Sequence, residues 1–419
     1  MMKKLIAILL TAVLLCGCGS SAETTENPFD ALTSTAQGET SDTKAESQPV
    51  TKTQEDTEAP TESEAPETQP ESTEAPETQP TETEKDIPDS SAIFRFAGDF
   101  TQAEEGGDGV YMAIMQALDG TYDGDITRVF SSDLLELMQS ADVFMLNNEF
   151  TFSTRGKPLE HKTWTFRANP RRVENLKIMG VDCVGLANNH AFDWGEDSLL
   201  DTIDTLDQAG IDHAGAGRNL EEAKQAVYYN VKGRTYSIVA ATAVEKSWDP
   251  ENGLTRSATA DQAGVLRTTD PAETLDAIRT AKQNSDMCFV FVHWGIELED
   301  MPEEEQKSLA KQYIDAGADA VIGAHPHILQ GIEYYNGKPI IYSMGNFWFN
   351  SKVRPTCLFE IEVDSRTLEM TVRFHPCLQR DCRTVLVTKE DSRKDAIAAE
   401  QAISFGITID YDGTVHQAQ

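Results

Sequence analysis

The chain has 419 residues, a formal net charge of −35 at pH 7 and a hydrophobic content of 39%. This length is sufficient for a large hydrophobic core. The strong acidity makes nucleic acid and anionic membrane surfaces poor partners, because both would be repelled. Clusters of acidic side chains are better tolerated where they bind cations.

Residues 1–17 have the features of a bacterial lipoprotein signal peptide. Lys3 and Lys4 form a basic start, and residues 5–15 form an apolar stretch that is too short to span a bilayer. The stretch ends in Leu-Cys-Gly-Cys18, which resembles a lipobox with Cys18 as the lipidated residue. We therefore predict an extracytoplasmic protein with a lipid anchor in the cell membrane. A plain signal peptide that is cut nearby is the alternative.

Residues 18–88 are dominated by Thr, Glu, Ser, Pro and Ala, and the segment 64–70 recurs at 74–80. Almost nothing in this stretch could be buried in a core, so we predict a disordered linker. Its prolines and its excess of acidic side chains favour an extended stalk. We expect the stalk to lift the following domain, residues 89–419, away from the membrane.

Apolar runs alternate with helical patterns along residues 89–419, which predicts one α/β domain with two sheets. Glycine follows several helical patterns, and Lys-Gly and Asn-Gly pairs mark two hairpins. Strands are predicted at 92–97, 143–146, 183–187, 227–231, 235–241, 288–292, 320–323, 329–335, 339–343, 358–363 and 370–375, and helices at 132–139, 170–179, 196–209, 271–283 and 302–316.

Six of the predicted strands end in a carboxylate, imidazole or amide side chain. In open α/β sheets, such strand ends are the usual place for a site. His325 and His327 are two residues apart with a proline between them, so an extended backbone would place both on one face, where they can approach one metal centre. The strand-end residues are Asp99, Asn147 with Glu149, Asn188 to His190 with Asp193, His293 with Glu297, His325 with His327, and Asn346.

Each of these residues alone has an ordinary structural explanation. A single Gly-Asp is usually a turn, a buried asparagine usually bonds a loop, and a lone histidine on an apolar strand is usually a core residue. Turn chemistry does not explain all six together, so the pattern predicts a metal-binding rim. Carboxylate and amide oxygens combined with imidazole suit Mn, Fe or Zn, in one or two ions.

The ordered motifs over residues 92–350 resemble the CapA-type poly-γ-glutamate capsule synthesis family. The series is Gly-Asp, Asn-x-Glu, Asn-Asn-His-x-x-Asp-x-Gly, His-Trp-Gly-x-Glu, Gly-x-His-x-His and Ser-x-Gly-Asn. That family is similar to the calcineurin-like metallophosphoesterases. The resemblance therefore implies a four-layer α/β/β/α sandwich built around two metal ions.

The same resemblance implies roles for individual residues. Six would bind metal: Asp99 and His327 the first ion, Asn189, His293 and His325 the second, and Glu149 both. His190 would protonate a leaving group, oriented by Asp193.

One position departs from the metallophosphoesterase pattern, which usually begins Asp-x-His. Here Thr101 stands in place of that histidine, so the first ion loses an imidazole. Glu297 could replace it, with Asn346 as a further accessory residue. A single-metal or non-catalytic site stays open as an alternative.

The motifs and the lipobox together predict a surface-anchored, metal-dependent hydrolase-fold protein in capsule or cell-envelope polymer synthesis. The bond that it hydrolyses would be a phosphoester or a γ-glutamyl amide. Its partner would be an anionic polymer such as poly-γ-glutamate, and membrane capsule-synthesis subunits are further candidate partners. The alternative is a non-catalytic capsule assembly or export subunit that binds polyglutamate. A third hypothesis is an adhesion or solute-binding lipoprotein without metal.

Cysteines and loop cations complete the predictions. Cys183 and Cys288 lie in apolar runs and are expected to be buried thiols. Among Cys357, Cys377 and Cys382, one disulfide is possible in an extracytoplasmic protein, and sequence leaves its pairing open. Lys162, Arg155 and Arg167 could contact an anionic substrate, with a solvated loop as the alternative.

Overall fold

The structure is a computed structural model that describes residues 87–106, 112–160, 162–244 and 256–418. The predicted signal peptide, the lipidation site Cys18 and nearly all of the predicted linker lie outside these ranges. Within them, no helix is both long enough and apolar enough to cross a membrane.

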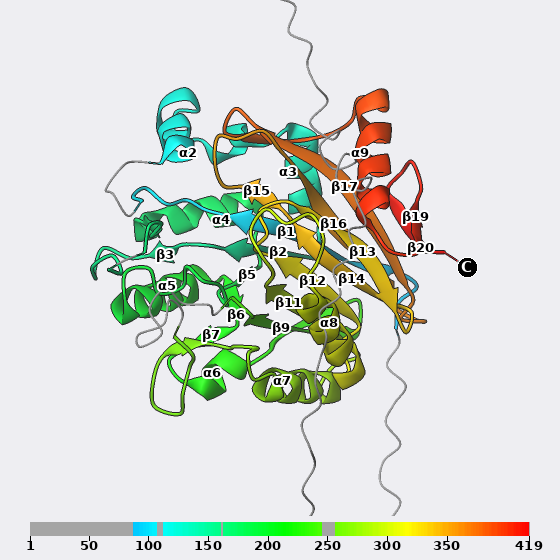
Figure 1. Cartoon of the computed structure of the whole chain (residues 1–419), viewed down its shortest axis with the longest axis horizontal. Helices are drawn as coiled ribbons and strands as arrows, with labels where there is room; N and C mark the ends of the chain where they lie inside the picture. The colour runs from blue at the N-terminus through cyan, green and yellow to red at the C-terminus, as the bar shows by residue number, and fades with distance from the viewer. Residues whose placement is uncertain (1–86, 107–111, 161, 245–255, 419) are drawn as a thin grey trace, which may run out of the picture.

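Two β-sheets form the centre of the described fold, and helices cover their outer faces (Figure 1). This arrangement confirms the predicted four-layer α/β/β/α class. The first sheet has ten strands among the described residues, in the order β19 (Ile407–Ile409), β20 (Thr414–Gln417), β17 (Met370–Arg380), β16 (Arg354–Asp364), β1 (Ser91–Phe100), β2 (Val143–Asn148), β5 (Cys183–Gly185) and β6 (Asp212–Ala214), with β15 (Asn346–Trp348) beside β1 and β18 (Arg383–Leu386) beside β17.

The second sheet has six strands and is built mainly from the middle of the chain. β9, β11, β12 and β14 run parallel to one another, and the hairpins β8–β9 and β13–β14 close the two edges. The order is β13 (Leu329–Tyr335), β14 (Lys338–Met344), β12 (Ala320–Ala324), β11 (Met287–His293), β9 (Arg234–Thr242) and β8 (Val227–Val231). Two small pairs lie outside the main sheets, β3 (Thr151–Phe152) with β4 (Arg167–Ala168) and β7 (Ala216–Gly217) with β10 (Gly264–Val265).

Alternate residues of the strands fill the space between the two sheets. In β1, Phe94 and Phe96 point into this core, where Phe94 lies 4.6 Å from Tyr236 and 5.0 Å from Phe289 between ring centroids. Arg95, on the opposite face, instead binds Glu360 at 2.7 Å. Each buried phenylalanine stabilises the fold by about 2–3 kcal/mol, so this aromatic layer fixes the two sheets against each other.

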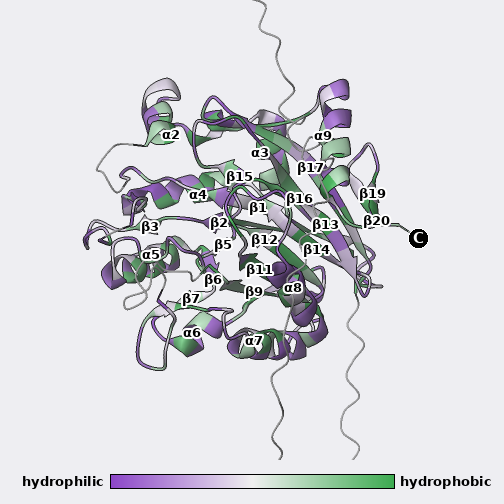
Figure 2. Ribbon diagram, in the orientation of Figure 1, coloured by the Kyte–Doolittle hydropathy of each residue, from purple (hydrophilic) through white to green (hydrophobic). Residues whose placement is uncertain are grey.

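Helices bury their apolar stripes on the outer faces of the sheets, and Figure 2 shows hydrophobic strands inside with mixed helices around them. The first sheet is covered by α3 (Ser132–Gln139), α4 (Val173–Met179) and α5 (Glu196–Ala209), and the second by α7 (Ala272–Gln283) and α8 (Glu304–Ala316). α9 (Glu390–Ile403) packs on β13 and β19. Short elements are α2 (Ala113–Gln116), η2 (Ala117–Thr121), η3 (Ile126–Val129), η4 (Pro170–Arg172) and α6 (Leu220–Lys224).

Most predicted elements are confirmed, and the differences lie at their ends. The helices at 132–139 and 196–209 are confirmed to the residue. The strand predicted at 183–187 ends at Gly185, because the chain leaves the sheet there to form the loop that carries Asn188. The predicted helix at 302–316 begins at Glu304, since Glu303 and Gln306 form a capping box. Helix α9 and the strands β18, β19 and β20 were not predicted.

The disulfide that the three C-terminal cysteines could supply is absent from this structure, where all three are free and buried. Cys357 packs in the core between the sheets, whereas Cys377 and Cys382 pack in the core beneath the outer helices. Side chains on opposite faces of a strand pair cannot be bridged. The predicted buried thiols Cys183 and Cys288 are confirmed.

Glu400 on α9 is a buried carboxyl far along the chain from the strand-end motifs. It is 1% exposed, its Oε2 has no hydrogen-bond partner among the described residues, and burial raises its pKa from 4.5 to about 8. Between these two pH values the folded state holds a proton that the unfolded state has released. Stability conferred by this group therefore falls as pH rises from about 4.5 to about 8.

We expect Glu400→Gln to stabilise the protein at pH 8 by about 1–3 kcal/mol and to have little effect below pH 4.5, because the neutral amide removes the cost of a buried charge. Chemical denaturation at several pH values would measure this difference. Glu136→Gln, at an exposed position of α3, is the control and should follow the parent protein throughout. A constant Glu400→Gln difference across pH would contradict the assignment.

Candidate metal centre

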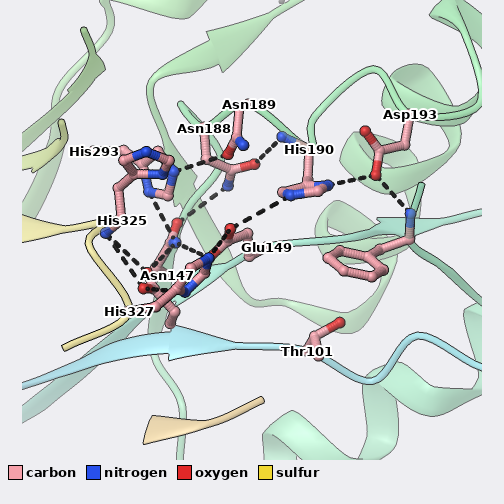
Figure 3. A network of polar contacts seen from close by, with 12 residues as sticks. Thr101, Asn147, Glu149, Asn188, Asn189, His190, Asp193, His293, His325 and His327 are labelled. Atoms are coloured by element: carbon pink, nitrogen blue, oxygen red, sulfur yellow. Dashed lines mark hydrogen bonds and ion pairs between the residues drawn. The ribbon is translucent and has the colours of Figure 1, made fainter. Parts of the chain in front are cut away.

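The polar strand-end residues meet where strands of both sheets end. β1, β2 and β5 deliver side chains from the first sheet, and β11 and β12 deliver them from the second. Strands β1 and β2 are parallel, as are β11 and β12, so their carboxyl ends meet at one edge. Figure 3 shows the cluster, with Glu149 between His190 on one side and Asn147 and His327 on the other.

One group of ligand atoms lies on the side of the second sheet. Glu149, His293 and His325 each offer one atom, and these atoms lie within 4.8 Å of one another. The amide oxygen Oδ1 of Asn189 is 2.9 Å from His293 Nε2. Two ligands of one ion, each about 2.0–2.2 Å from it, are typically about 3 Å apart. The four residues predicted for the second ion are therefore brought together.

A second group lies toward the first sheet. Asp99, Glu149 and His327 offer atoms within 4.8 Å of one another, and His327 Nδ1 is 3.1 Å from Asp99 Oδ2. Asp99 is fully buried and also accepts hydrogen bonds from the backbone N–H of His325. Glu149 belongs to both groups, which is the position that the resemblance implies for a bridging ligand.

Two buried atoms of the site lack partners in a way that fits a cation. Glu149 Oε1 and His325 Nδ1 are buried and have no hydrogen-bond partner among the described residues. Burial, followed by the charge of Asp99, raises the pKa of Glu149 well above 4.5. Burial lowers the pKa of His325 to about 3 and that of His293 well below 6.5. Neutral imidazoles beside carboxylates are metal ligands, so the residues present fit a divalent ion.

Asp99 and His327 show the opposite electrostatic behaviour. Burial alone would raise the pKa of Asp99, but the hydrogen bond and charge of His327 lower it overall. Burial would lower the pKa of His327, and the same contact with Asp99 raises it. The two side chains therefore stabilise each other's charged forms. A bound cation would replace His327 as the positive partner of Asp99.

Asn147 contacts ligands of both groups, although its sequence position predicted only that it lies at a strand end. Its Nδ2 lies 2.8 Å from Asp99 Oδ1, 3.1 Å from Glu149 Oε2 and 3.1 Å from His293 Nδ1. Its Oδ1 accepts a hydrogen bond from Asn188 at 3.1 Å. Asn147 thus orients ligands of both groups. The Asn-Asn-Glu run held the only sequence signal for it.

His190 and Asp193 form a buried pair beside Glu149. His190 Nδ1 is 2.6 Å from Asp193 Oδ2, its ring stacks on Phe166 at 4.4 Å, and its Nε2 is 3.6 Å from Glu149 Oε1. Burial, followed by opposing effects of Asp193 and Lys162, lowers the pKa of His190 to about 4. The catalytic roles of His190 and Asp193 stay predictions, and their geometry permits proton movement at Nε2.

Lys162, Arg155 and Arg167, the three basic residues considered as contacts for an anionic substrate, differ in burial and in their partners. Lys162 is buried, and its Nζ donates to the backbone oxygen of Asn189 at 2.6 Å and to Asp193. Arg155 instead forms surface ion pairs on α5, and Arg167 pairs with Glu105. Lys162 therefore belongs to the structure of the site, and the solvated-loop alternative does not hold for it.

The structure also places Thr101, which stands where metallophosphoesterases usually have a histidine, and the two accessory residues Glu297 and Asn346. Thr101 is fully buried and accepts a hydrogen bond from the backbone N–H of Ala103, at 3.2 Å. Glu297 is exposed and does not belong to either ligand group. Asn346 Oδ1 lies 2.8 Å from His327 Nδ1, so it positions that ring.

Comparison with known proteins identifies relatives over the part of the chain that holds the site. Residues 95–351 match the family model described as "Bacterial capsule synthesis protein PGA_cap". This match contains every residue predicted to bind metal. It also contains the predicted catalytic pair.

Three named relatives are similar to part of the chain. The PGA biosynthesis protein CapA of Bacillus subtilis is 37% identical over 44% of this chain and 47% of its own length. The capsule biosynthesis protein CapA of Bacillus anthracis is 36% identical over 44% of each chain. A probable polyglutamine synthesis accessory protein of Mycobacterium tuberculosis is 33% identical over 49% of this chain and 55% of its own. The chain spans about half the length of these relatives.

The shared position of Glu149 leads to a prediction about metal binding. We expect Glu149→Gln to weaken Mn²⁺ binding at least tenfold, because it removes a buried negative charge common to both ligand groups. In EDTA the variant should be as stable as the parent protein or more so, and added Mn²⁺ should raise the melting temperature of the parent more than that of the variant.

Metal analysis after reloading, calorimetry and thermal unfolding with and without EDTA would measure these effects. Glu400→Gln is the matched control, since it neutralises a buried carboxyl outside the site. Mn²⁺ binding by Glu149→Gln at the affinity of the parent would refute the bridging assignment.

Proposed function

This chain belongs to the bacterial capsule synthesis protein PGA_cap family, and from that membership we propose that it acts in the synthesis of a capsule or cell-envelope polymer of the poly-γ-glutamate type. We propose further that it does so as a metal-dependent hydrolase on a phosphoester or γ-glutamyl amide bond. The observation that carries the proposal is the pair of ligand groups that share buried Glu149.

Six residues would hold one or two ions of Mn, Fe or Zn. Asp99 and His327 would bind the first, Asn189, His293 and His325 the second, and Glu149 would contact both. A bound pair of divalent ions supplies charge neutralisation for the attacking and leaving oxygens of a hydrolysis. Asn147 would keep Asp99, Glu149 and His293 in position through its three contacts.

His190 would exchange a proton with the reacting group at Nε2. Asp193 accepts from Nδ1 and so leaves Nε2 directed at the Glu149 side of the site. The lowered pKa keeps the His190 ring neutral at pH 7. His190 would therefore first accept a proton at Nε2 and then donate it to the leaving group. Phe166 and Lys162 would hold the pair against rotation.

The location proposed for this activity is the outer surface of the cell membrane. The lipobox that ends at Cys18 supports a lipid anchor, and the Thr/Glu/Pro-rich linker supports a spacer between membrane and catalytic domain. Membrane capsule-synthesis subunits and an anionic polymer are the partners we propose. The names of two relatives, which refer to PGA biosynthesis and capsule biosynthesis, support the polymer.

A non-catalytic role in capsule assembly or export is the second candidate, and Thr101 favours it. The residue occupies the place of a metal-binding histidine and is bonded to nearby backbone instead. A weakened first metal would leave a site that binds polymer without cleaving it. This candidate would be supported if the protein is fully loaded with metal and binds polyglutamate but turns over no substrate.

We expect His190→Ala to lower turnover by at least a hundredfold while leaving metal content unchanged, because the residue lies outside both ligand groups. The assay would use Mn²⁺-loaded protein with a panel of phosphoesters and γ-glutamyl peptides. His416→Ala, at an exposed histidine paired with Asp410, is the control and should keep full activity. Undiminished turnover by His190→Ala would exclude its proposed role.

We expect Cys18→Ser to release the protein from the membrane fraction, because the lipid anchor would have no attachment point. Fractionation of the cells that express each form, together with labelling by radioactive palmitate, would measure this. Cys16→Ser is the matched control and should stay in the membrane. A labelled, membrane-bound Cys18→Ser protein would show that Cys18 is not the lipidated residue.

A further inference from the structure

A pocket of about 440 Å³ adjoins the candidate metal centre. It lies between the segment that follows β11 and the start of α8, and Asn189 and His325 form part of its lining. His325 is 4% exposed, and its Nδ1 has no hydrogen-bond partner among the described residues. A ligand in this pocket would therefore lie directly beside the proposed metal ligands.

The pocket combines an apolar wall with carboxylates. Trp294 and Leu309 are buried residues of the wall, and Ile296 is half-exposed beside them. Three glutamates and one arginine line the pocket within the described residues, namely Glu297, Glu303, Glu305 and Arg267. The described lining residues are thus negative overall, which is an unfavourable environment for a polyanion.

Two of the three glutamates are available to a ligand. Glu303 caps α8 and accepts the backbone N–H of Gln306. Glu297 and Glu305 form no ion pair with the residues that the structure describes. Burial and the charge of Asp99 are the larger causes of the raised pKa of Glu149, and the charge of Glu297 adds to them. A cationic ligand group would be attracted to these carboxylates.

We propose that this pocket binds the ammonium-bearing end of the substrate, a primary amine on an aliphatic stem. The amine would lie between Glu297 and Glu305, and the stem would pack on Ile296 and Leu309. The next bond along the chain would then face the metal centre. This inference rests on the proposed function. It assigns the enzyme to an end of its polymer that carries an amine without a neighbouring carboxylate, because carboxylates would be repelled from the pocket.

The test compares 6-aminohexanoate with N-acetyl-6-aminohexanoate, which differ in the charge of the amine and contain no γ-glutamyl bond. Calorimetric titration would use the full-length protein loaded with Mn²⁺. We expect at least fivefold tighter binding of the free amine, since each exposed carboxylate contributes a modest attraction. In the double variant Glu297→Gln/Glu305→Gln the preference should fall below twofold.

Glu304→Gln is the matched control, because Glu304 lies on the same turn of α8, pairs with Lys307 and does not line the pocket. It should keep the full preference. Equal affinity for the two probes, binding of neither, or an unchanged preference in the double variant would overturn the assignment. Metal content and turnover of the same preparations would be measured as well. Loss of metal binding or turnover would count against the proposed function, whereas loss of the amine preference alone would count against this assignment.

Discussion

The buried carboxylate of Glu149 is the constraint on which the proposed site depends. It has no exposed surface, one of its oxygens lacks a hydrogen-bond partner among the described residues, and Asp99 adds a second negative group nearby. Burying a carboxylate without compensation is costly, and the group then either takes up a proton or binds a cation. Two neutral imidazoles, His293 and His325, lie within reach and favour the cation.

The rest of the fold holds this arrangement in place. Two sheets that pack through a layer of aromatic side chains bring the ends of β1 and β2 against the ends of β11 and β12. Asn147 then connects ligands from both sheets through one amide group. A network of this kind loses its geometry when one member is removed, because each remaining buried polar group is left without a partner. Its rigidity suits a site that must position an ion and a substrate together.

Charge is distributed unevenly around the site, and this distribution affects which part of a substrate can reach the metal ligands. Lys162 is buried against Asn189 and Asp193 and compensates negative charge within the site itself. The adjoining pocket carries carboxylates toward solvent instead. A polymer with many carboxylates would meet repulsion there along most of its length, whereas an end that carries an amine without a neighbouring carboxylate would not. The charge pattern thus restricts which part of such a polymer could reach the metal ligands.

The sequence alone determined the local features: the strand and helix pattern, the strand-end motifs and six candidate metal ligands. The confirmed helices at 132–139 and 196–209 show why, since their periodicity and termini are encoded within a few neighbouring residues. Only the tertiary structure decided which sheet each strand joins, that Asn147 connects the two groups, that Lys162 is buried and that Cys357 faces away from Cys377. These facts depend on contacts between residues far apart along the chain, and a local pattern carries no information about the partner that long-range packing will bring to it.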